Sequence, residues 1–476
     1  MIFSSEKELI SYYSKFRNSN LNTLKNFTQS NFPEIKLKTN KGIVGQVLES
    51  LIGNAPNNDP NPDVLNLGIE LKVMPLRKSS NSLVPKERSK IKKINYNSIL
   101  DESWDTSFLK KKISKILFFL YEQPIGKTYR DWEEFTFLGT LLFDLQVDSY
   151  HIIKNDWSEI QKKVKSHLAH ELSEGDSKVL GACTSGTGKI EKYDGLYEAK
   201  ERSYSLKHNY LKLFYLEKYK KKKFENLNIV INRSFEEELI AKLDQNIYSK
   251  TLDELVEKFN IENNNFSKNK SAFHLLLKRI FNINPNIEIR DFEENNIVVK
   301  TIPVNSAYKP YESMSFNKFS LSELVYQDWN GDNDDDDSLL EADFKNSISK
   351  TFIFIPIIKR KNKKTFNAWQ EWVVGKPVLW SPSSQEFATI EKEWSMTKQI
   401  IVDGVNVWKE KHGSKFRQRN NLTKESETEI IHIRPKARDS KDIDKDFYKY
   451  SNGQISISYQ CFWLNKKFVY DKIKPN

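Results

Sequence analysis

Apolar and polar residues near the N-terminus change from helical spacing to strand spacing. Between residues 42 and 53 the apolar positions follow the period of a packed helix, and Gly53 favours a helix end; they are Ile43, Val44, Val47, Leu48, Leu51 and Ile52. We expect a strand over residues 64–73, with Ile69, Leu71 and Val73 on one face, because strand side chains alternate between the two faces. The pattern therefore predicts a helix that carries Glu49 beside a strand that carries Glu70 and Lys72.

Three carboxylates and a lysine in this region suggest a chemistry. Asp63 follows Pro62, and with Glu70 and Lys72 it gives the spacing PD…(D/E)xK, while Glu49 lies on the preceding helix. Carboxylate oxygens are the ligands that Mg²⁺ prefers, usually one or two of them with water and a substrate phosphate. The metal acidifies a bound water and stabilises the charged transition state of phosphodiester hydrolysis. The alternative for this fragment alone is a solvated strand face, because short acidic-basic strings occur by chance.

The surrounding segments carry a family resemblance. Residues 41–49, 68–75 and 104–107, followed by Lys112 and the apolar run 116–119, resemble the MutH family of GATC endonucleases. The resemblance implies that Asp63, Glu70 and Lys72 form the central catalytic triad. It also implies the metal ligands Asp63, Glu70 and Glu49, and the further catalytic residues Lys41, Glu87 and Lys112. Lys112 is one of three consecutive lysines, and Lys110 and Lys111 are the alternatives to it.

The second half of the chain repeats this layout with most of the carboxylates replaced. A helical run over 273–282, Asp291 and a strand over 297–303 parallel the first copy, and Lys300 corresponds to Lys72. Val298 stands in the place of Glu70, and no glutamate matches Glu49, where Leu277 or Lys278 stands. Ser347 matches Lys112. A site with one carboxylate cannot hold Mg²⁺ in the same way, so we expect the second copy to be catalytically inactive.

Later segments of the second copy resemble the family more closely than those of the first. They are residues 377–382, a helix over 387–402 with Trp394, and 433–437. The resemblance implies that Arg434, Pro435 and Lys436 contact the DNA site, and arginine suits bidentate hydrogen bonding to guanine. An ordinary basic loop is the alternative.

A strand follows this loop and supplies a further candidate for DNA binding. Apolar residues alternate from Ile455 to Cys461, and the strand then delivers Trp463. The first-copy equivalents are Ser205 and Lys207, which follow a loop over 180–189 that departs from Arg-Pro-Lys.

Composition and charge restrict the class of protein. The 476 residues allow two ordinary domains, and the net charge of +11 makes a polyanionic partner plausible. Cys183 and Cys461 are too few for a disulfide framework or a zinc site, and we interpret them as buried thiols. No apolar run approaches membrane length, so we expect an intracellular, soluble, cytoplasmic protein. Residues 183–190 lack the first glycine and the final Ser/Thr of a phosphate loop, so we expect no nucleotide cofactor.

The predicted architecture is α/β with a mixed sheet, in two tandem PD-(D/E)xK restriction-endonuclease-like domains of which the second is degenerate. We predict a catalytic domain over 1–215, a basic linker over 216–233 and a DNA-binding or effector-binding domain over 234–476. This arrangement resembles the staphylococcal-type GATC restriction endonucleases.

That resemblance implies a type II, effector-stimulated endonuclease that hydrolyses double-stranded DNA at GATC with Mg²⁺. The substrate would bind the N-terminal domain and an effector copy of the site the C-terminal domain. One intact catalytic site per chain leads us to expect dimerisation on DNA. The alternatives are a mismatch-repair-type GATC nickase and a non-catalytic DNA-binding regulator.

Overall fold

The chain folds into two compact units. The computed structural model describes residues 1–56, 61–79, 82–124, 127, 129–184, 189–227, 229, 234–261, 272–331, 340–362, 365–413, 415–437, 442–445, 447–451 and 456–475. Unit 1 comprises Met1–Lys222 and Asn330–Glu341, and unit 2 comprises Lys223–Trp329 and Ala342–Asn476. The first change of unit thus falls inside the basic segment 216–233. The loop 332–337, rich in aspartate, lies outside the described residues.

Unit 1 combines helices with mixed and antiparallel sheets. Its elements are α1 (Glu6–Ser14), α2 (Leu21–Asn31), α3 (Ile43–Ser50), β1 (Glu70–Ser79), β2 (Ser82–Pro85), β3 (Ser89–Lys93), α4 (Ser98–Asp101), α5 (Phe108–Ile113), β4 (Lys115–Glu122), β5 (Thr136–Asp144), α6 (Tyr150–Lys165), β6 (Leu180–Thr184), β7 (Ile190–Tyr193), β8 (Tyr197–Lys200), β9 (Arg202–Leu206), α7 (His208–Phe214) and β15 (Leu340–Glu341).

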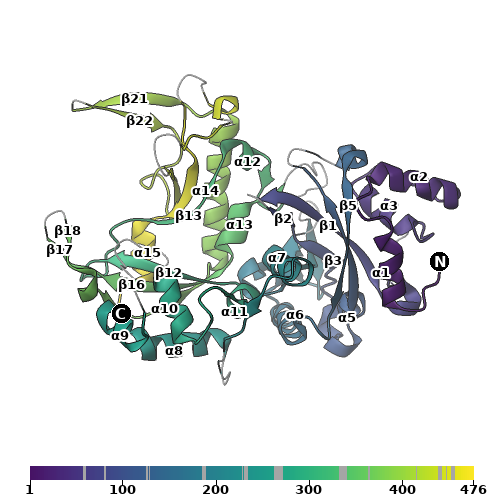
Figure 1. Cartoon of the computed structure of the whole chain (residues 1–476), viewed down its shortest axis with the longest axis horizontal. Coiled ribbons are helices and arrows are strands. Elements are labelled where there is room, and N and C mark those ends of the chain that lie inside the picture. Colours follow the sequence, from purple (N-terminus) through teal and green to yellow (C-terminus); the bar gives the residue numbers. More distant parts are fainter. Residues whose placement is uncertain are drawn as a thin grey trace. The chain divides into compact units, whose positions relative to one another are not determined.

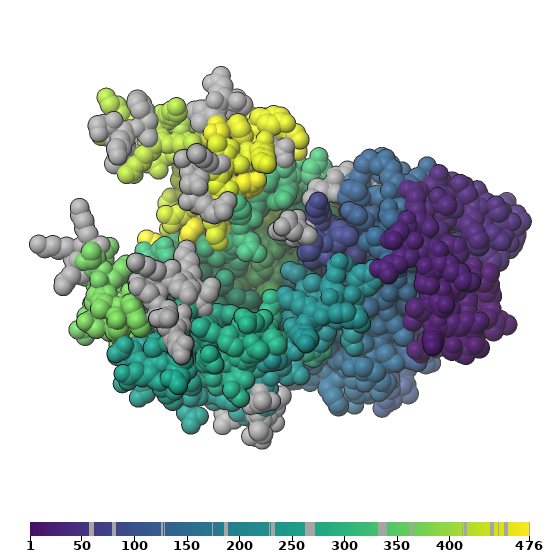
Figure 2. Space-filling model, in the orientation of Figure 1, coloured from purple at the N-terminus to yellow at the C-terminus, as the bar shows by residue number. Residues whose placement is uncertain are grey.

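A four-stranded sheet in the order β2-β1-β4-β5 forms the centre of unit 1. Strand β4 is parallel to β1 and antiparallel to β5, and its residues 116–121 are buried because helices cover both faces of the sheet. Leu71, Leu117 and Phe119 pack with α1 and α3, whereas Phe118 and Leu120 pack with α6 and α7. Figure 1 shows α1–α3 gathered on one side of β1 and β5, and in Figure 2 the same helices form a contiguous purple layer.

The predicted strand over 64–73 is wrong at its beginning. Residues Leu65–Leu67 form a 3₁₀ turn, and β1 starts only at Glu70. The chain turns back at Gly68, whose φ of 64° favours glycine, and Val64 pairs with Ile69 across the turn. From Ile69 onward the predicted alternation is confirmed, because Ile69 and Leu71 are buried in the apolar core beside α3.

A second sheet of unit 1 has the antiparallel order β3-β9-β6. A buried carboxylate on α6 fixes the chain that enters β6. Asp156 accepts hydrogen bonds from the backbone N–H groups of Lys178, Val179 and Leu180 at 2.9, 2.7 and 2.8 Å. The pKa of Asp156 is raised by burial, against which the three backbone donors act.

Unit 2 is also a mixed α/β structure. Its elements are β10 (Phe224–Glu225), α8 (Phe235–Ile247), α9 (Leu252–Lys258), α10 (Ala272–Ile280), β11 (Glu288–Ile289), α11 (Arg290–Glu294), β12 (Ile297–Val304), β13 (Met314–Phe319), α12 (Leu321–Val325), β14 (Gln327–Asp328), α13 (Asp343–Ile348), β16 (Thr351–Ile358), β17 (Lys361–Asn362), β18 (Thr365–Phe366), β19 (Val373–Val374), β20 (Val378–Trp380), α14 (Ser384–Val402), β21 (Val407–His412), β22 (Lys415–Asn420), β23 (Ile431–Pro435), β24 (Gln460–Leu464) and α15 (Lys466–Ile473).

Strand β16 is the buried centre of unit 2, parallel to β12 and antiparallel to β19 and β20. Ile353 and Ile355 pack with α8–α10, while Phe352 and Phe354 pack on the opposite face with α14 and α15. A second sheet has the antiparallel order β13-β24-β23. Figure 1 shows α8–α10 grouped on the other side of β12 from α14.

One sequence-based expectation for unit 2 needs correction. The strand expected over 455–461 starts only at Gln460 within the described residues 456–475, and Ile455 lies outside them. Asp291, the counterpart of Asp63, lies on the short helix α11. The helix expected over 387–402 is confirmed as α14, which starts three residues earlier and buries Trp394. Cys183 and Cys461 are buried free thiols, as expected. No helix in the described part of the chain is long and apolar enough to cross a membrane.

Candidate active site and DNA-contact surface

Glu70 is the centre of a group of charged side chains in unit 1, at the start of β1. Its side chain is buried, with 3% of the residue exposed, and each carboxylate oxygen faces a lysine. Lys72 Nζ lies 3.1 Å from Oε1, and Lys112 Nζ lies 2.7 Å from Oε2. Lys112 comes from α5 and also donates to the backbone oxygen of Asn61 at 3.1 Å. The two lysines thus compensate the charge of a carboxylate that burial would otherwise destabilise.

Of the three consecutive lysines, only Lys112 reaches Glu70. Lys110 pairs with Asp105 at 2.6 Å, and Lys111 lies over the ring of Phe108. The last turn of α5 therefore directs one lysine toward β1 and the other two away from it.

Glu49 and Asp63 complete the group. Burial raises the pKa of Glu49 to about 7, and repulsion from Asp63 and Glu70 adds to the shift, while Lys72 and Lys112 oppose it. Burial and the charge of Glu70 also raise the pKa of Asp63. Asp63 is held by its neighbours, because Oδ2 accepts from the Leu71 N–H at 2.8 Å. We refer to Glu49, Asp63, Glu70, Lys72 and Lys112 as the carboxylate cluster.

Lys41 and Glu87 lie at the ends of other segments. Lys41 precedes α3, and Glu87 lies in the connection between β2 and β3. The charges that act most strongly on Glu49 come from the carboxylate cluster, and neither Lys41 nor Glu87 is among them. Their assignment as auxiliary catalytic residues stays a prediction.

The carboxylate cluster has the residue types of a divalent-cation site, but its side chains are not arranged as ligands around a cation. Among the described residues, no three carboxylate, histidine or cysteine side chains are gathered closely enough to hold a metal ion. The reason is visible at Glu70, where both oxygens face lysines. The donors nevertheless fit a hard cation, because Mg²⁺ takes oxygen ligands and needs only one or two carboxylates beside water and phosphate. A cation would also relieve the repulsion that raises the pKa values of Glu49 and Asp63.

The raised pKa of Glu49 predicts a pH-dependent stability for the metal-free protein. Between the ordinary value of 4.5 and about 7, the folded state holds a proton that the unfolded chain has released. Stability is therefore lost as pH rises through this window. Glu49→Gln should remove the loss of stability that is due to Glu49. The measurement is the change in melting temperature in EDTA between about pH 5 and about pH 8. Glu122→Gln, on β4 outside the cluster, is the control; an equal slope in both variants contradicts the prediction.

The predicted DNA-contact residues of unit 2 lie together on its second sheet. Arg434 and Pro435 are exposed at the end of β23, and the Arg434 guanidinium lies over the Trp463 ring at 5.3 Å. Trp463 belongs to β24, the neighbouring strand. Lys436 is partly buried, and its Nζ donates to Ser315 Oγ at 3.3 Å. A cation stacked on an indole is held in place while its donors stay exposed.

Their first-copy counterparts are less accessible. Ser205 is fully buried on β9, and its Oγ accepts a long hydrogen bond of 3.4 Å from Arg88. Lys207 is also buried, and its Nζ donates to the backbone oxygen of Ser177 at 2.5 Å. Residues 185–188 of the predicted recognition loop lie outside the described residues. A DNA-binding role for Ser205 and Lys207 stays a prediction, because the described side chains satisfy interactions inside unit 1.

Unit 1 contains a buried ion pair that sequence reasoning missed. Arg88 Nε and Nη2 donate to the two carboxylate oxygens of Glu341 at 3.2 and 2.5 Å, and both side chains are nearly buried. Glu341 ends the short strand β15, which is assigned to unit 1. No local pattern in the sequence indicates the pair, because its partners are 253 residues apart. The pair ties Glu341 to the residue that directly follows Glu87 in the chain.

Comparison with known proteins finds similarity to DNA endonucleases in the part of the chain that contains most of the cluster. The family described as the DNA mismatch repair enzyme MutH matches residues 52–156, which include Asp63, Glu70, Lys72 and Lys112. The type II restriction enzyme Sau3AI of Staphylococcus aureus is 26% identical over 480 residues, covering 92% of this chain and 93% of that enzyme. The DNA mismatch repair protein MutH of Vibrio campbellii is 30% identical over 128 residues, covering 27% of this chain and 54% of that protein. MutH of Actinobacillus pleuropneumoniae is 24% identical over 172 residues, covering 36% and 74%.

Proposed function

We propose that this chain, a member of the MutH-like endonuclease family, is a type II restriction endonuclease that cuts double-stranded DNA at GATC with Mg²⁺. It is a DNA endonuclease, and its similarity to a restriction enzyme extends over 92% of its length. This extent of similarity carries the proposal. By contrast, the mismatch repair protein MutH of Vibrio campbellii matches only 27% of the chain.

The carboxylate cluster is the proposed catalytic centre. When bound, the divalent cation supplies an acidified water and stabilises charge on the phosphate. Asp63, Glu70 and Glu49 are the proposed ligands, and the raised pKa values of Glu49 and Asp63 support a site that would take up a cation in exchange for a proton. Lys72 orients the attacking water and assists its deprotonation. Lys112 holds the second oxygen of Glu70 at 2.7 Å, so that this carboxylate keeps one orientation.

Unit 2 is proposed to be a second copy of the same fold. In unit 1, Glu70 and Lys72 pair with Ile116 and Phe118 of the parallel neighbour strand. In unit 2, Val298 and Lys300 pair in the same way with Phe352 and Phe354. The buried carboxylates also correspond. Glu393 on α14 accepts from the backbone N–H groups of Glu429, Ile430 and Ile431 at the start of β23, as Asp156 on α6 does at the start of β6. Each carboxylate is followed by a buried tryptophan, Trp157 or Trp394.

The second copy has lost the proposed catalytic carboxylates. Val298 replaces Glu70, and Asp291 lies on α11, where it accepts from the Leu227 N–H at 2.5 Å. Ser347, at the position of Lys112, donates to the backbone oxygen of Asp343. We therefore propose that unit 2 binds a second copy of the DNA site, through Arg434, Lys436 and Trp463, and stimulates cutting by unit 1. With one intact centre per chain, two chains meet on DNA to cut both strands.

Digestion of unmethylated plasmid in Mg²⁺, with sequencing of the fragment ends, tests this function. We expect double-strand ends at GATC. Ends at another sequence would keep the nuclease and discard the specificity. Nicked circles as the end point would favour a mismatch-repair-type nickase. The similarity to DNA mismatch repair proteins supports this alternative. Intact plasmid despite tight binding would leave a non-catalytic DNA-binding regulator.

A further inference from the structure

Unit 2 has a two-stranded ribbon that extends beyond its packed core. Strands β21 and β22 pair with each other over their whole length, and in the described part of the chain they pair with no other strand. Figure 1 shows the ribbon standing apart from α14 and β13. The base of the ribbon is fixed to unit 2, because Val407 is buried in the core and Gln418 Nε2 donates to the backbone oxygen of Ser456 at 2.5 Å.

The ribbon is strongly basic. Residues 407–420 contain five lysine or arginine residues and one glutamate. The glutamate accepts from Arg419 Nε at 2.7 Å, so these two charges compensate each other. Lys409, Lys411 and Arg417 are exposed on the two strands. The ribbon therefore presents a net positive charge to its surroundings.

An aromatic side chain is exposed on the same ribbon. Trp408 is 42% exposed, and Arg419 stands opposite it in the strand register. The residues 408–411 and 417–419 are all exposed, so this part of the ribbon packs on no core. A two-stranded ribbon without a core is at best marginally stable in water. A partner that covers the ribbon would stabilise it.

Duplex DNA matches both the charge and the shape of the ribbon. The major groove admits a two-stranded β-ribbon, and lysine or arginine side chains along the ribbon reach the phosphates that border the groove. Each strand has six residues, which gives a length of about 20 Å, or about six base pairs. Lysines on an exposed ribbon also hinder its pairing with other chains, and this protective role is the alternative.

The ribbon is connected to the sheet that carries the proposed DNA-contact residues. After β22 the chain returns to β23, which carries Arg434, and the Ile433 N–H donates to the backbone oxygen of Thr423 in this connection at 3.0 Å. The segment that anchors the ribbon at Ser456 leads into β24, which carries Trp463. The base of the ribbon is therefore fixed beside the sheet on which the effector site is proposed to bind.

We propose that the β21–β22 ribbon is a second DNA-contact element of unit 2, which binds the duplex beside the effector site. Lys409, Lys411 and Arg417 contact backbone phosphates, while Arg434 and Trp463 contact the site itself. This inference rests on the proposed function of unit 2 as a DNA-binding domain. It adds that part of the affinity for effector DNA comes from the flanking backbone, whatever its base sequence.

Binding of two fluorescent GATC duplexes to the full chain in EDTA tests the proposal. The long duplex has about thirty base pairs, and the short one has about three base pairs on each side of the site, fewer than the ribbon spans. Lys409→Ala/Arg417→Ala should weaken binding to the long duplex about tenfold or more and reduce the slope of log K against log salt by about 1.8, the value for two phosphate contacts. Its binding to the short duplex should change little.

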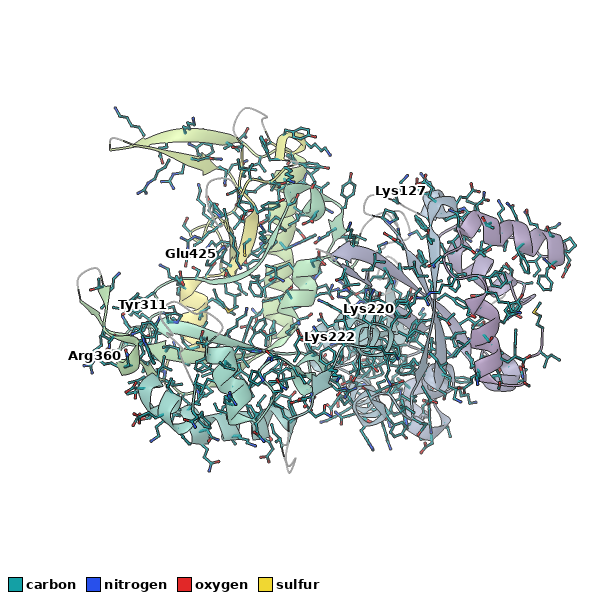
Figure 3. All side chains as sticks on the ribbon, in the orientation of Figure 1. Lys127, Lys220, Lys222, Tyr311, Arg360 and Glu425 are labelled. Atoms are coloured by element: carbon teal, nitrogen blue, oxygen red, sulfur yellow. The ribbon has the colours of Figure 1, made fainter. Side chains whose placement is uncertain are left out.

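A matched pair of charges on another hairpin is the control. Arg360, labelled in Figure 3, and Lys361 are exposed at the β17–β18 hairpin, which Figure 1 shows apart from the β21–β22 ribbon. Arg360→Ala/Lys361→Ala removes the same two kinds of charge and should leave binding to both duplexes close to that of the parent protein. Lys409→Arg/Arg417→Lys keeps both charges of the ribbon and should retain most of the affinity for the long duplex.

Arg434→Ala separates the two levels of the proposal. If it weakens binding to both duplexes while Lys409→Ala/Arg417→Ala binds the long duplex like the parent protein, unit 2 binds DNA and the ribbon is not a contact element. If neither variant weakens binding, the proposed function of unit 2 fails as well. Equal losses for the ribbon variant and the Arg360 control, or for the long and the short duplex, overturn the proposal. A loss of affinity that the charge-retaining variant shares overturns it in favour of a structural role.

Discussion

Asp63→Asn should lower the rate of DNA cleavage by about a thousandfold, equivalent to about 4 kcal/mol in the activation free energy. The substitution removes the negative charge that the proposed cation needs but leaves the side chain the same size. The amide oxygen can still accept the hydrogen bond that Asp63 takes from the Leu71 N–H at 2.8 Å. Folding and DNA binding should therefore be retained. The measurement is the initial rate of plasmid cleavage in saturating Mg²⁺, with binding to the same plasmid measured in parallel.

Asp144→Asn is the matched control for this substitution. Asp144 ends β5, and its Oδ1 likewise accepts from a backbone N–H, that of Gln146 at 2.9 Å, but it is not part of the carboxylate cluster. We expect it to cut at close to the parental rate. Equal rates for Asp63→Asn and the parent would mean that the cluster is not the catalytic centre, and the nuclease activity would have to be sought elsewhere in the chain.

Asp156→Ala should destabilise unit 1 by about 3–5 kcal/mol, because it leaves three buried backbone N–H groups without an acceptor. These donors belong to Lys178, Val179 and Leu180, and they fix the start of β6. The residue is 2% exposed, so water cannot replace the carboxylate without a rearrangement of the chain. For a unit of this size the loss corresponds to a fall of about 10 °C in the melting temperature.

Two substitutions on α6 make this expectation specific. Asp156→Asn keeps one acceptor oxygen and should fall between the parent and the alanine variant. Glu159→Ala removes an exposed carboxylate from the same helix, whose nearest basic partner Lys162 is 3.9 Å away, and should change stability little. If differential scanning calorimetry gives the same transition for Asp156→Ala and Glu159→Ala, the backbone of β6 does not depend on the carboxylate.

Much of the carboxylate cluster could be predicted from local sequence alone. Glu70 and Lys72 are two residues apart in a strand, so they had to share a face once the strand formed. The apolar residues before Gly53 follow the period of a helix, so the position of Glu49 on α3 could also be predicted from local sequence. The beginning of β1 could not be predicted as well, because the turn at Gly68 competes with the extended chain, and its closure depends on the pairing of Val64 with Ile69.

Contacts between distant segments were harder to predict. Three consecutive lysines were available to meet Glu70, and only the parallel pairing of β1 with β4 and the direction of α5 selected Lys112. The ion pair of Arg88 with Glu341 left no local pattern, because neither residue lies in a periodic segment that points to the other.

The sequence by itself determined the kinds of residue at the proposed sites, the two buried central strands and the helices that pack against them. These properties depend on side-chain type and on a period of two or about 3.6 residues, both of which are local. Only the tertiary structure decided that the pKa of Glu49 is raised to about 7 and that both oxygens of Glu70 face lysines. Burial and charge separation set these properties, and neither exists until segments far apart in the chain have packed together.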